Sequence, residues 1–386
     1  MLTRVFHGSR RYWALVALWA VLILIGLFAY SRQFSQGLSV TGMSRDVSWG
    51  LYIAQFTFMV GIAASAVMVV LPYYLHDYKA FGRTVILGEF LAVSAVLVCV
   101  LFIFVDMGQP RRVMNVILHP RPNSVMFWDS MVLLGYLLLN LVIGTTAIES
   151  ERKGAPPPRW VRPLIYLSIP WAVSIHTVTA FLYSGLGARP FWMTAILAPR
   201  FLASAFAAGP SLLILLALLV RRFGGFDVGE RSIRALSVIV TYAMVVNVFF
   251  VLVEMFTALY SGIPHDVDTF AYLLAGLQGH TALRPWTWVG DFLAVACVVL
   301  LLVPAVRHRE RWLAWLCAGV IASLWIEKGL ALIVAGFIPS PLDHITEYAP
   351  TPPEIAITIG VYAVGGLVLT ALYKVVLSVR KDLQFA

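Results

Sequence analysis

Residues 49–75 read WGLYIAQFTFMVGIAASAVMVVLPYYL and contain no charged side chain. A helix needs about 20 mostly apolar residues to cross the hydrocarbon layer of a membrane. In such a helix every backbone hydrogen bond is satisfied internally, so no backbone group has to face lipid unpaired. This stretch therefore predicts a transmembrane helix.

Similar apolar stretches recur along the rest of the chain. No alternation of apolar and polar residues, which is typical of half-buried strands, competes with them. The fold class predicted is an all-α polytopic membrane protein with about ten transmembrane helices. In chain order the predicted spans are 12–30, 49–75, 84–105, 125–148, 163–188, 201–220, 235–264, 285–306, 312–338 and 355–373.

The overall composition agrees with a membrane protein. Of the 386 residues, 60% are apolar and only 12% are charged, whereas soluble domains carry about 25% charged residues. This excludes a soluble enzyme, a disordered chain and a secreted disulfide scaffold. The three cysteines, Cys99, Cys297 and Cys317, lie singly inside apolar spans. Without a CxxC spacing they predict neither a disulfide framework nor a metal or iron–sulfur site.

The net charge of +9 is explained by orientation in the membrane rather than by nucleic acid, because the basic residues lie between the apolar spans. With ten spans, both termini lie on one side, and that side holds 19 of the 28 lysines and arginines. The positive-inside rule therefore predicts cytoplasmic termini and a multi-pass protein of the cell (inner) membrane. The opposite side, called the far side below, holds Arg32, Arg45, Arg111, Arg112, Arg121, Arg189, Arg200 and Arg284.

Ionisable residues in or at the ends of the spans are functional candidates, since each costs several kcal/mol to bury in hydrocarbon. Structural explanations compete with function. Asp129 and Asp291 also suit the positive end of a helix dipole, and Glu327 with Lys328 also suits an internal ion pair. His176 is the one histidine deep inside a span, so a haem with two histidine ligands is not predicted. The full set is Glu89, Asp106, Asp129, His176, Glu254, Asp291, Glu327 and Lys328.

Several short strings, in this order and spacing, resemble the NrfD/PsrC family, the membrane subunits of polysulfide-reductase-type respiratory complexes. Within the family the chain is most similar to the DsrP subgroup of sulfite-reduction-associated DsrMKJOP complexes; a similar subunit of the high-molecular-weight cytochrome complex is the alternative. The strings are WGLYIA at 49–54, GIAA at 61–64, DMGQPR at 106–111, WD at 128–129, IHT at 175–177, RPFW at 189–192, EKG at 327–329, FIPSP at 337–341 and EYAPT at 347–351.

The resemblance implies a single integral membrane domain, residues 1–386, built from two four-helix bundles. Helices two to five (49–188) would form the first bundle and helices six to nine (189–338) the second. Segments 1–48 and 339–386 would each contribute one flanking helix and one far-side loop.

The resemblance also implies a quinone pocket in the far-side half of the membrane. Asp106, Asp129 and His176 are the residues expected at the pocket and in its proton exchange. Tyr52, Gln55 and Trp128 are expected to contact the quinone. Some family members use a histidine ligand where this chain has Phe56, so that ligand is not carried over. The candidates for a proton route are Glu89, Tyr136, Asn140, Glu254, Glu327 and Lys328.

The function implied is a subunit of a quinone-linked oxidoreductase complex in dissimilatory sulfur metabolism, rather than a complete enzyme. It would exchange electrons between menaquinone or ubiquinone and a ferredoxin-like iron–sulfur subunit on the periplasmic face, possessing no haem or cluster itself. Cytochrome b and cytochrome c subunits and membrane lipids are the other expected partners, and nucleic acid is not. Proton translocation would accompany turnover. A stand-alone secondary transporter and a non-catalytic membrane anchor remain the alternatives.

Overall fold

The computed structural model describes residues 5–385, with only the backbone described for residues 381–385. Two of the basic residues counted above, Arg4 and the side chain of Lys381, lie outside these limits. Ten helical spans of the described chain are long and apolar enough to cross a membrane, which confirms the predicted fold class. They are α1 (Arg10–Gln36), α2 (Leu51–Ala63) with η3 (Ala64–Ala66) and α3 (Val67–Leu75), α4 (Val85–Asp106), α6 (Val125–Arg152), α7 (Val161–Ser184), α8 (Leu197–Gly224), α9 (Glu230–Ser261), α11 (Arg284–Leu302), α13 (Glu310–Leu324) with η7 (Trp325–Ala331) and α14 (Leu332–Ala335), and α15 (Pro352–Phe385).

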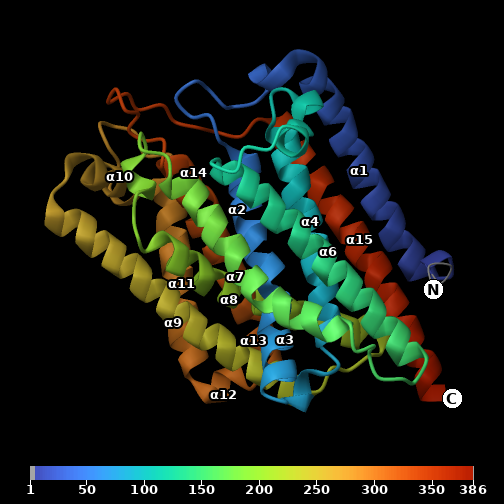
Figure 1. Cartoon of the computed structure of the whole chain (residues 1–386). Coiled ribbons are helices and arrows are strands. Elements are labelled where there is room, and N and C mark those ends of the chain that lie inside the picture. Colours follow the sequence, from blue (N-terminus) through green and yellow to red (C-terminus); the bar gives the residue numbers. More distant parts are fainter. Residues whose placement is uncertain (1–4, 386) are drawn as a thin grey trace.

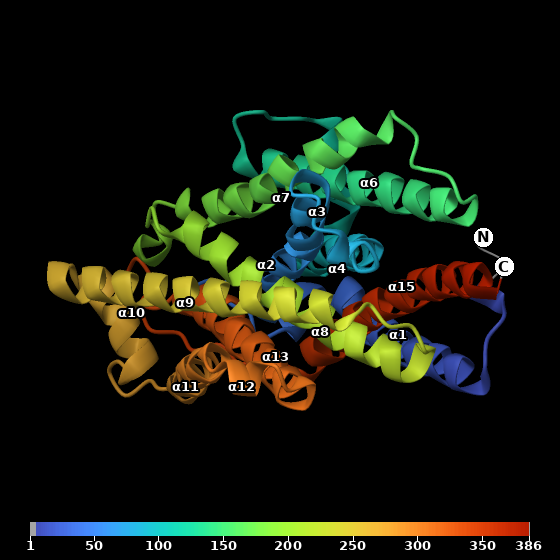
Figure 2. The same ribbon diagram turned by 90° about the horizontal axis from the view of Figure 1, so that it is seen from below.

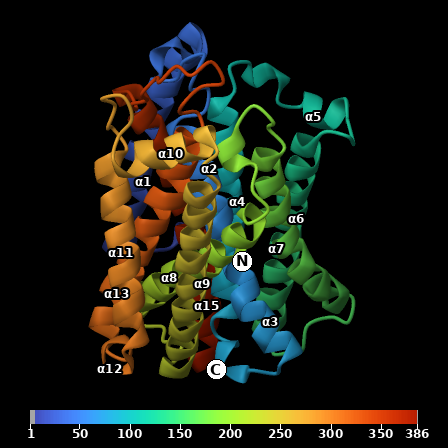
Figure 3. The same cartoon turned by 90° about the vertical axis from the view of Figure 1, so that its left-hand side faces the viewer.

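Short helices occupy the connections between the spans. The described C-terminal end lies at the end of the molecule that carries α12, and the N-terminal end lies in the same half, while α5 and α10 lie toward the opposite end, the far side (Figures 1 and 3). The short elements are η2 (Gly37–Val40), η4 (Lys79–Phe81), η5 (Pro110–Arg112), α5 (Asn115–Leu118), η6 (Pro190–Trp192), α10 (Pro264–Leu274) and α12 (Pro304–Arg307).

Helix α2 is the centre of the molecule. All of its residues are buried, and it contacts α4, α7, α8 and η7. Seen from below, it lies among α4, α7 and α8 (Figure 2). A helix that is enclosed on every side has no polar face. This agrees with the absence of charged side chains in residues 51–63.

The other spans pack around α2 in a few close pairs. Helix α4 contacts α6, and α6 contacts α7, while α8 contacts α9 and α13. Helix α11 completes the second group against α13. The division of the spans into two four-helix bundles stays a prediction.

Two helices end at glycines that adopt a left-handed conformation. Gly225 follows α8 with a φ of 69°, and Gly262 follows α9 with a φ of 65°. A residue without Cβ takes this conformation at little cost, so glycine commonly terminates helices. The span predicted over 235–264 therefore ends at Ser261, and a separate helix, α10, begins at Pro264.

Helix α1 is held mainly by α15 (Figure 1). Where they cross, a Cβ built on Gly360 would lie 2.7 Å from the Cα of Gly26. Small residues of this kind allow the backbones of two membrane helices to approach closely. Trp19 adds a hydrogen bond from its Nε1 to Thr370 Oγ1 at 3.2 Å.

We expect Gly360→Leu to push α1 away from α15 and to destabilise the protein by about 1–3 kcal/mol, the usual cost of overpacking. The midpoint of thermal denaturation in detergent measures this effect. Gly187→Leu is the control, because a Cβ at Gly187 meets nothing within 4 Å. Equal midpoints for the two variants would contradict the close crossing.

Candidate functional site

The far-side end of α4 brings two predicted site residues together. The Tyr52 hydroxyl donates to Gln33 Oε1 at 2.7 Å, and Gln33 Nε2 donates to the carbonyl of Val105 at 2.6 Å. Asp106 follows directly, and its Oδ1 is buried with no hydrogen-bond partner among the described residues. Gln33, a residue that sequence reasoning missed, thus connects Tyr52 to the end of α4.

A small groove opens next to this group, between α1 and the segment that follows α4. Tyr30 and Gln33 line it on one side, and Met107 and Gly108 on the other. Its empty space, counted out to the open mouth, is about 210 Å³. The groove places Gln33 between Tyr52 and the surface.

Gln55 lies one turn beyond Tyr52 on the same face of α2. Its Oε1 accepts hydrogen bonds from Trp325 Nε1 in η7 and from the Tyr362 hydroxyl in α15, both at 2.6 Å. Its Nε2 is buried and has no partner in the described chain. The amide nitrogen is therefore available to a further acceptor.

Asp129 and His176 form a second group, on α6 and α7. Asp129 Oδ1 accepts a 2.6 Å hydrogen bond from Thr179 Oγ1. His176 lies three residues before Thr179, is fully buried, and neither of its ring nitrogens has a partner within residues 5–385. No hydrogen bond joins this group to Asp106 or Tyr52 in the described structure.

Glu89 lies in the first half of α4, on the side of the chain termini, and packs against α6. Both of its carboxylate oxygens are buried without a partner in the described part of the chain. A Cβ built on Gly144 would lie 3.3 Å from Glu89 Oε2. Asn140 is one turn away on α6 and donates to the carbonyl of Tyr136 at 2.8 Å. Tyr136, Asn140 and Gly144 thus lie on one face of α6, and Glu89 of α4 lies beside Gly144. No direct hydrogen bond joins Glu89 to Tyr136 or Asn140 in the described structure.

Trp128 is separate from these buried groups. Its side chain is 49% exposed, and its indole Nε1 donates to the carbonyl of Pro122 at 2.6 Å. It lies in the first turn of α6, at the far-side edge of the span. This is a common position for tryptophan at membrane interfaces.

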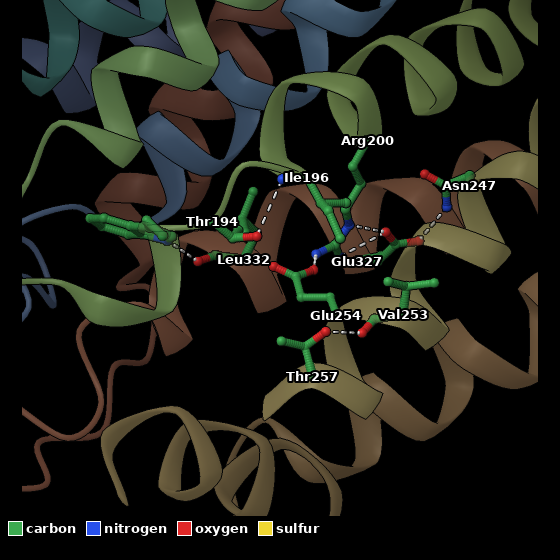
Figure 4. Close-up of polar contacts among 10 residues, drawn as sticks. Thr194, Ile196, Arg200, Asn247, Val253, Glu254, Thr257, Glu327 and Leu332 are labelled. Atoms are coloured by element: carbon green, nitrogen blue, oxygen red, sulfur yellow. Dashed lines mark hydrogen bonds and ion pairs between the residues drawn. The ribbon is translucent and has the colours of Figure 1, made fainter. Parts of the chain in front are cut away.

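An ion cluster joins the helices of the second half of the chain (Figure 4). Arg200, in the first turn of α8, forms ion pairs with Glu254 of α9 and with Glu327 of η7. Arg200 Nη2 donates to Glu327 Oε1 at 2.9 Å, and Asn247 Nδ2 donates to Glu327 Oε2 at 2.9 Å. The sequence predicts Arg200 outside the apolar spans, on the far side. The structure instead places it within α8, where the residue is only 8% exposed and is enclosed by helices.

Lys328, next to Glu327 in the chain, points to a different neighbour. Its Nζ lies 4.2 Å from the centre of the Phe201 ring and 3.5 Å from the Phe201 carbonyl oxygen. The two residues lie in the π-helical segment η7, a local widening that is frequent at functional sites. The internal ion pair between Glu327 and Lys328 is therefore absent from the described structure, and each finds partners on other helices.

A pocket lies beside the ion cluster. Arg200, Glu327 and Asp291 line it together with apolar residues of α9 and α10. Its empty space, counted out to the open mouth, is about 550 Å³.

A further polar contact closes the far-side end of the first half, at residues that the sequence analysis did not single out as site residues. The Tyr348 hydroxyl accepts from the Leu51 backbone N–H at 2.7 Å and donates to Glu354 Oε1 at 2.8 Å. Glu354 Oε2 accepts from the backbone N–H of Gly42 at 2.7 Å. Burial and the nearby Glu354 carboxylate raise the pKa of Tyr348. The phenol therefore stays protonated and anchors the start of α2.

These features define a multi-pass helical membrane protein with ionisable side chains buried between its spans. Residues 39–339 match the model of the family described as polysulphide reductase NrfD, so the chain belongs to that family. The resemblance predicted from the sequence strings is confirmed.

Curated relatives share most of their length with this chain. A putative membrane subunit of dimethyl sulfoxide reductase from Halobacterium salinarum is 27% identical, over 91% of this chain and 88% of the relative. The Hdr-like menaquinol oxidoreductase integral membrane subunit of Archaeoglobus fulgidus is 25% identical, over 88% and 83%. The menaquinone reductase integral membrane subunit of Nitratidesulfovibrio vulgaris is 21% identical, over 92% and 90%. All three are named as membrane subunits.

Proposed function

We propose that this chain is the quinone-interacting membrane subunit of a respiratory redox complex. It exchanges electrons between the quinone pool and a partner iron–sulfur subunit that docks on the far, periplasmic side. Two relatives carry menaquinol or menaquinone in their names, which favours menaquinone over ubiquinone. The similarity of the sequence strings to the DsrP subgroup favours a complex of dissimilatory sulfur metabolism that includes cytochrome b and cytochrome c subunits.

The observation that carries this proposal is the far-side group behind the groove at α1. It combines the unpartnered Asp106 Oδ1, the Tyr52 hydroxyl held by Gln33, and the unpartnered Gln55 Nε2. Buried polar atoms without partners are costly, and a bound ligand is one way in which they are satisfied. A quinone ring fits this chemistry, because it needs donors at its carbonyl oxygens and a group that exchanges protons.

The residues take distinct roles in this proposal. A quinol releases two electrons and two protons when it is oxidised. Gln55 Nε2 donates a hydrogen bond to one ring oxygen, and the Tyr52 hydroxyl orients the ring. Asp106 holds the proton that leaves the ring. The polar surroundings of the site are fixed before the ring arrives, so little reorganisation accompanies charge movement.

A longer proton route would connect the far-side half of the membrane to the cytoplasm. Asp129 and His176 lie in the far-side half, and Tyr136 and Asn140 continue along α6 to Glu89. Glu254, Glu327 and Lys328 offer a parallel set in the second half of the chain. With cytoplasmic termini, as the positive-inside rule indicates, protons would enter or leave at the Glu89 end.

Binding of a fluorescent quinol analogue, heptyl-hydroxyquinoline N-oxide, tests the quinone site. We expect the purified chain to quench its fluorescence and Asp106→Asn to weaken the affinity about tenfold, since a charge-assisted hydrogen bond is lost. Asp343→Asn, on an exposed far-side loop, is the matched control and should bind as the wild type does. A wild-type chain that binds no analogue would instead support the membrane anchor.

Co-purification tests the partners. The chain, extracted in a mild detergent from cells that express its complex, should carry an iron–sulfur subunit, seen as the absorbance of its clusters. Isolation of the chain by itself, with activity in moving a solute across vesicles, would support the secondary transporter.

A further inference from the structure

The pocket beside the ion cluster is not used by the proposed quinone site. Its lining comes from η6, α8, α9, α10, α11, η7 and α14, and none of the described elements before η6 contributes. The pocket therefore differs in position from the group around Tyr52, Gln55 and Asp106.

Most of the pocket lining is apolar, and lining residues of α9 and α11, namely Val251, Met255 and Asp291, are partly exposed. Val251 and Met255 of α9 line it, and each is followed in the chain by a side chain that is largely exposed, Leu252 and Phe256. On α11, Asp291 of the lining precedes Phe292, which is 72% exposed. In a ten-span membrane protein such exposed apolar faces contact lipid. A ligand would therefore enter from the bilayer, between α9 and α11.

The charged residues of the pocket lining, Arg200, Asp291 and Glu327, carry an excess of negative charge. Arg200 is already paired with both Glu254 and Glu327. Asp291 also lines the pocket, and it makes no hydrogen bond or ion pair within residues 5–380. Two carboxylates, Asp291 and Glu327, thus line the pocket with one guanidinium, which is already paired. A phosphate or carboxylate head would be repelled there, whereas a neutral group with hydroxyl donors would find charged acceptors.

The shape of the pocket beside Glu327 depends on the π-helical segment. Ile326, Glu327 and Ala331 of η7 all line the pocket. On the facing helix Gly290 allows close approach, because a Cβ there would lie 3.0 Å from Ile326 Cγ2. The widened helix and the glycine together set how closely α11 and η7 approach each other beside the carboxylates.

We propose that this pocket is a second quinol site, in which the ring hydroxyls donate to the carboxylates of Asp291 and Glu327. The apolar chain of the quinol leaves through the mouth between α9 and α11. This inference rests on the proposed function in one respect, namely that the physiological ligand is a quinol. It assigns this chain two separate sites in the far-side half of the membrane.

The stoichiometry of the same fluorescent quinol analogue tests the second site on the purified full chain. We expect about two equivalents bound by the wild type and about one by Leu274→Trp, which fills the pocket from α10. Asp291→Asn keeps the shape of the pocket and should weaken the second equivalent about tenfold. Val295→Trp adds the same indole on the lipid-facing side of α11, outside the lining, and should leave both equivalents intact.

The outcomes separate this inference from the proposed function. One equivalent that is weakened by Asp106→Asn and unaffected by Leu274→Trp would overturn the second site and leave the function intact. No binding at all would contradict both. Phosphorus analysis of the purified protein tests whether the pocket holds a phospholipid instead. A phospholipid retained by the wild type and lost from Leu274→Trp would overturn the assignment to a quinol.

Discussion

Replacing Arg200 with leucine is expected to destabilise the protein by about 3–5 kcal/mol, because two buried carboxylates lose their shared cation. Glu254 and Glu327 come from α9 and η7, so Arg200 holds three helical elements together through one side chain. Thermal denaturation in detergent measures the loss, and the yield of folded protein should fall with it.

The cause of this loss can be separated from the loss of packing. Adding Glu254→Gln and Glu327→Gln to Arg200→Leu removes the uncompensated charges, so the combined variant should be more stable than Arg200→Leu alone. Arg222→Leu changes an exposed arginine of the same helix and should alter the melting midpoint little. If the stability changes of Arg200→Leu, Glu254→Gln and Glu327→Gln simply add in the combined variant, the three side chains are not energetically coupled. The ion cluster would then not explain the loss of stability.

Glu89→Gln is expected to uncouple proton movement from electron transfer. Glutamine has the same size as glutamate and cannot take up a proton, so the site keeps its packing and loses its proton-transfer capacity. In proteoliposomes that contain the whole complex, proton uptake should fall by about tenfold or more, the usual scale for the loss of one positioned proton-transfer group. Electron transfer from quinol should fall much less.

The control for this experiment is Glu149→Gln. It removes a carboxylate near the C-terminal end of α6, which pairs with Arg152 and Lys153. It should leave both rates near those of the wild type. Equal losses of proton uptake and electron transfer in Glu89→Gln would eliminate Glu89 from a proton route. They would not contradict the proposed quinone site.

The ten spans were readable from the sequence because lipid imposes one rule on every segment that crosses it. A helix in hydrocarbon must be long and apolar, whichever neighbours it has. For the same reason residues 49–75 indicated a span, and the part of it that forms α2 is buried at the centre of the molecule. The strings at 106–111 and 327–329 also identified the family, because they retain its order and spacing.

The partners of the buried polar residues could not be read in this way. Arg200 looked like a loop residue because it stands close to the predicted start of a span. Only the fold shows that it turns inward to two glutamates that follow it by 54 and 127 positions. Likewise Glu327 and Lys328 are adjacent in the chain but contact different residues, Glu327 pairing with Arg200 and Asn247 and Lys328 lying against Phe201.

The sequence by itself determined the fold class, the positions of the spans and the family, since these depend on the apolarity of each segment and on local strings. Tertiary structure alone decided which buried charges meet, which polar atoms stay without a partner in the described chain, and where a pocket opens. The physical reason is that hydrophobicity acts on each segment independently. A hydrogen bond or an ion pair instead requires two atoms within a few ångströms, and that distance is set by the packing of helices far apart in the chain.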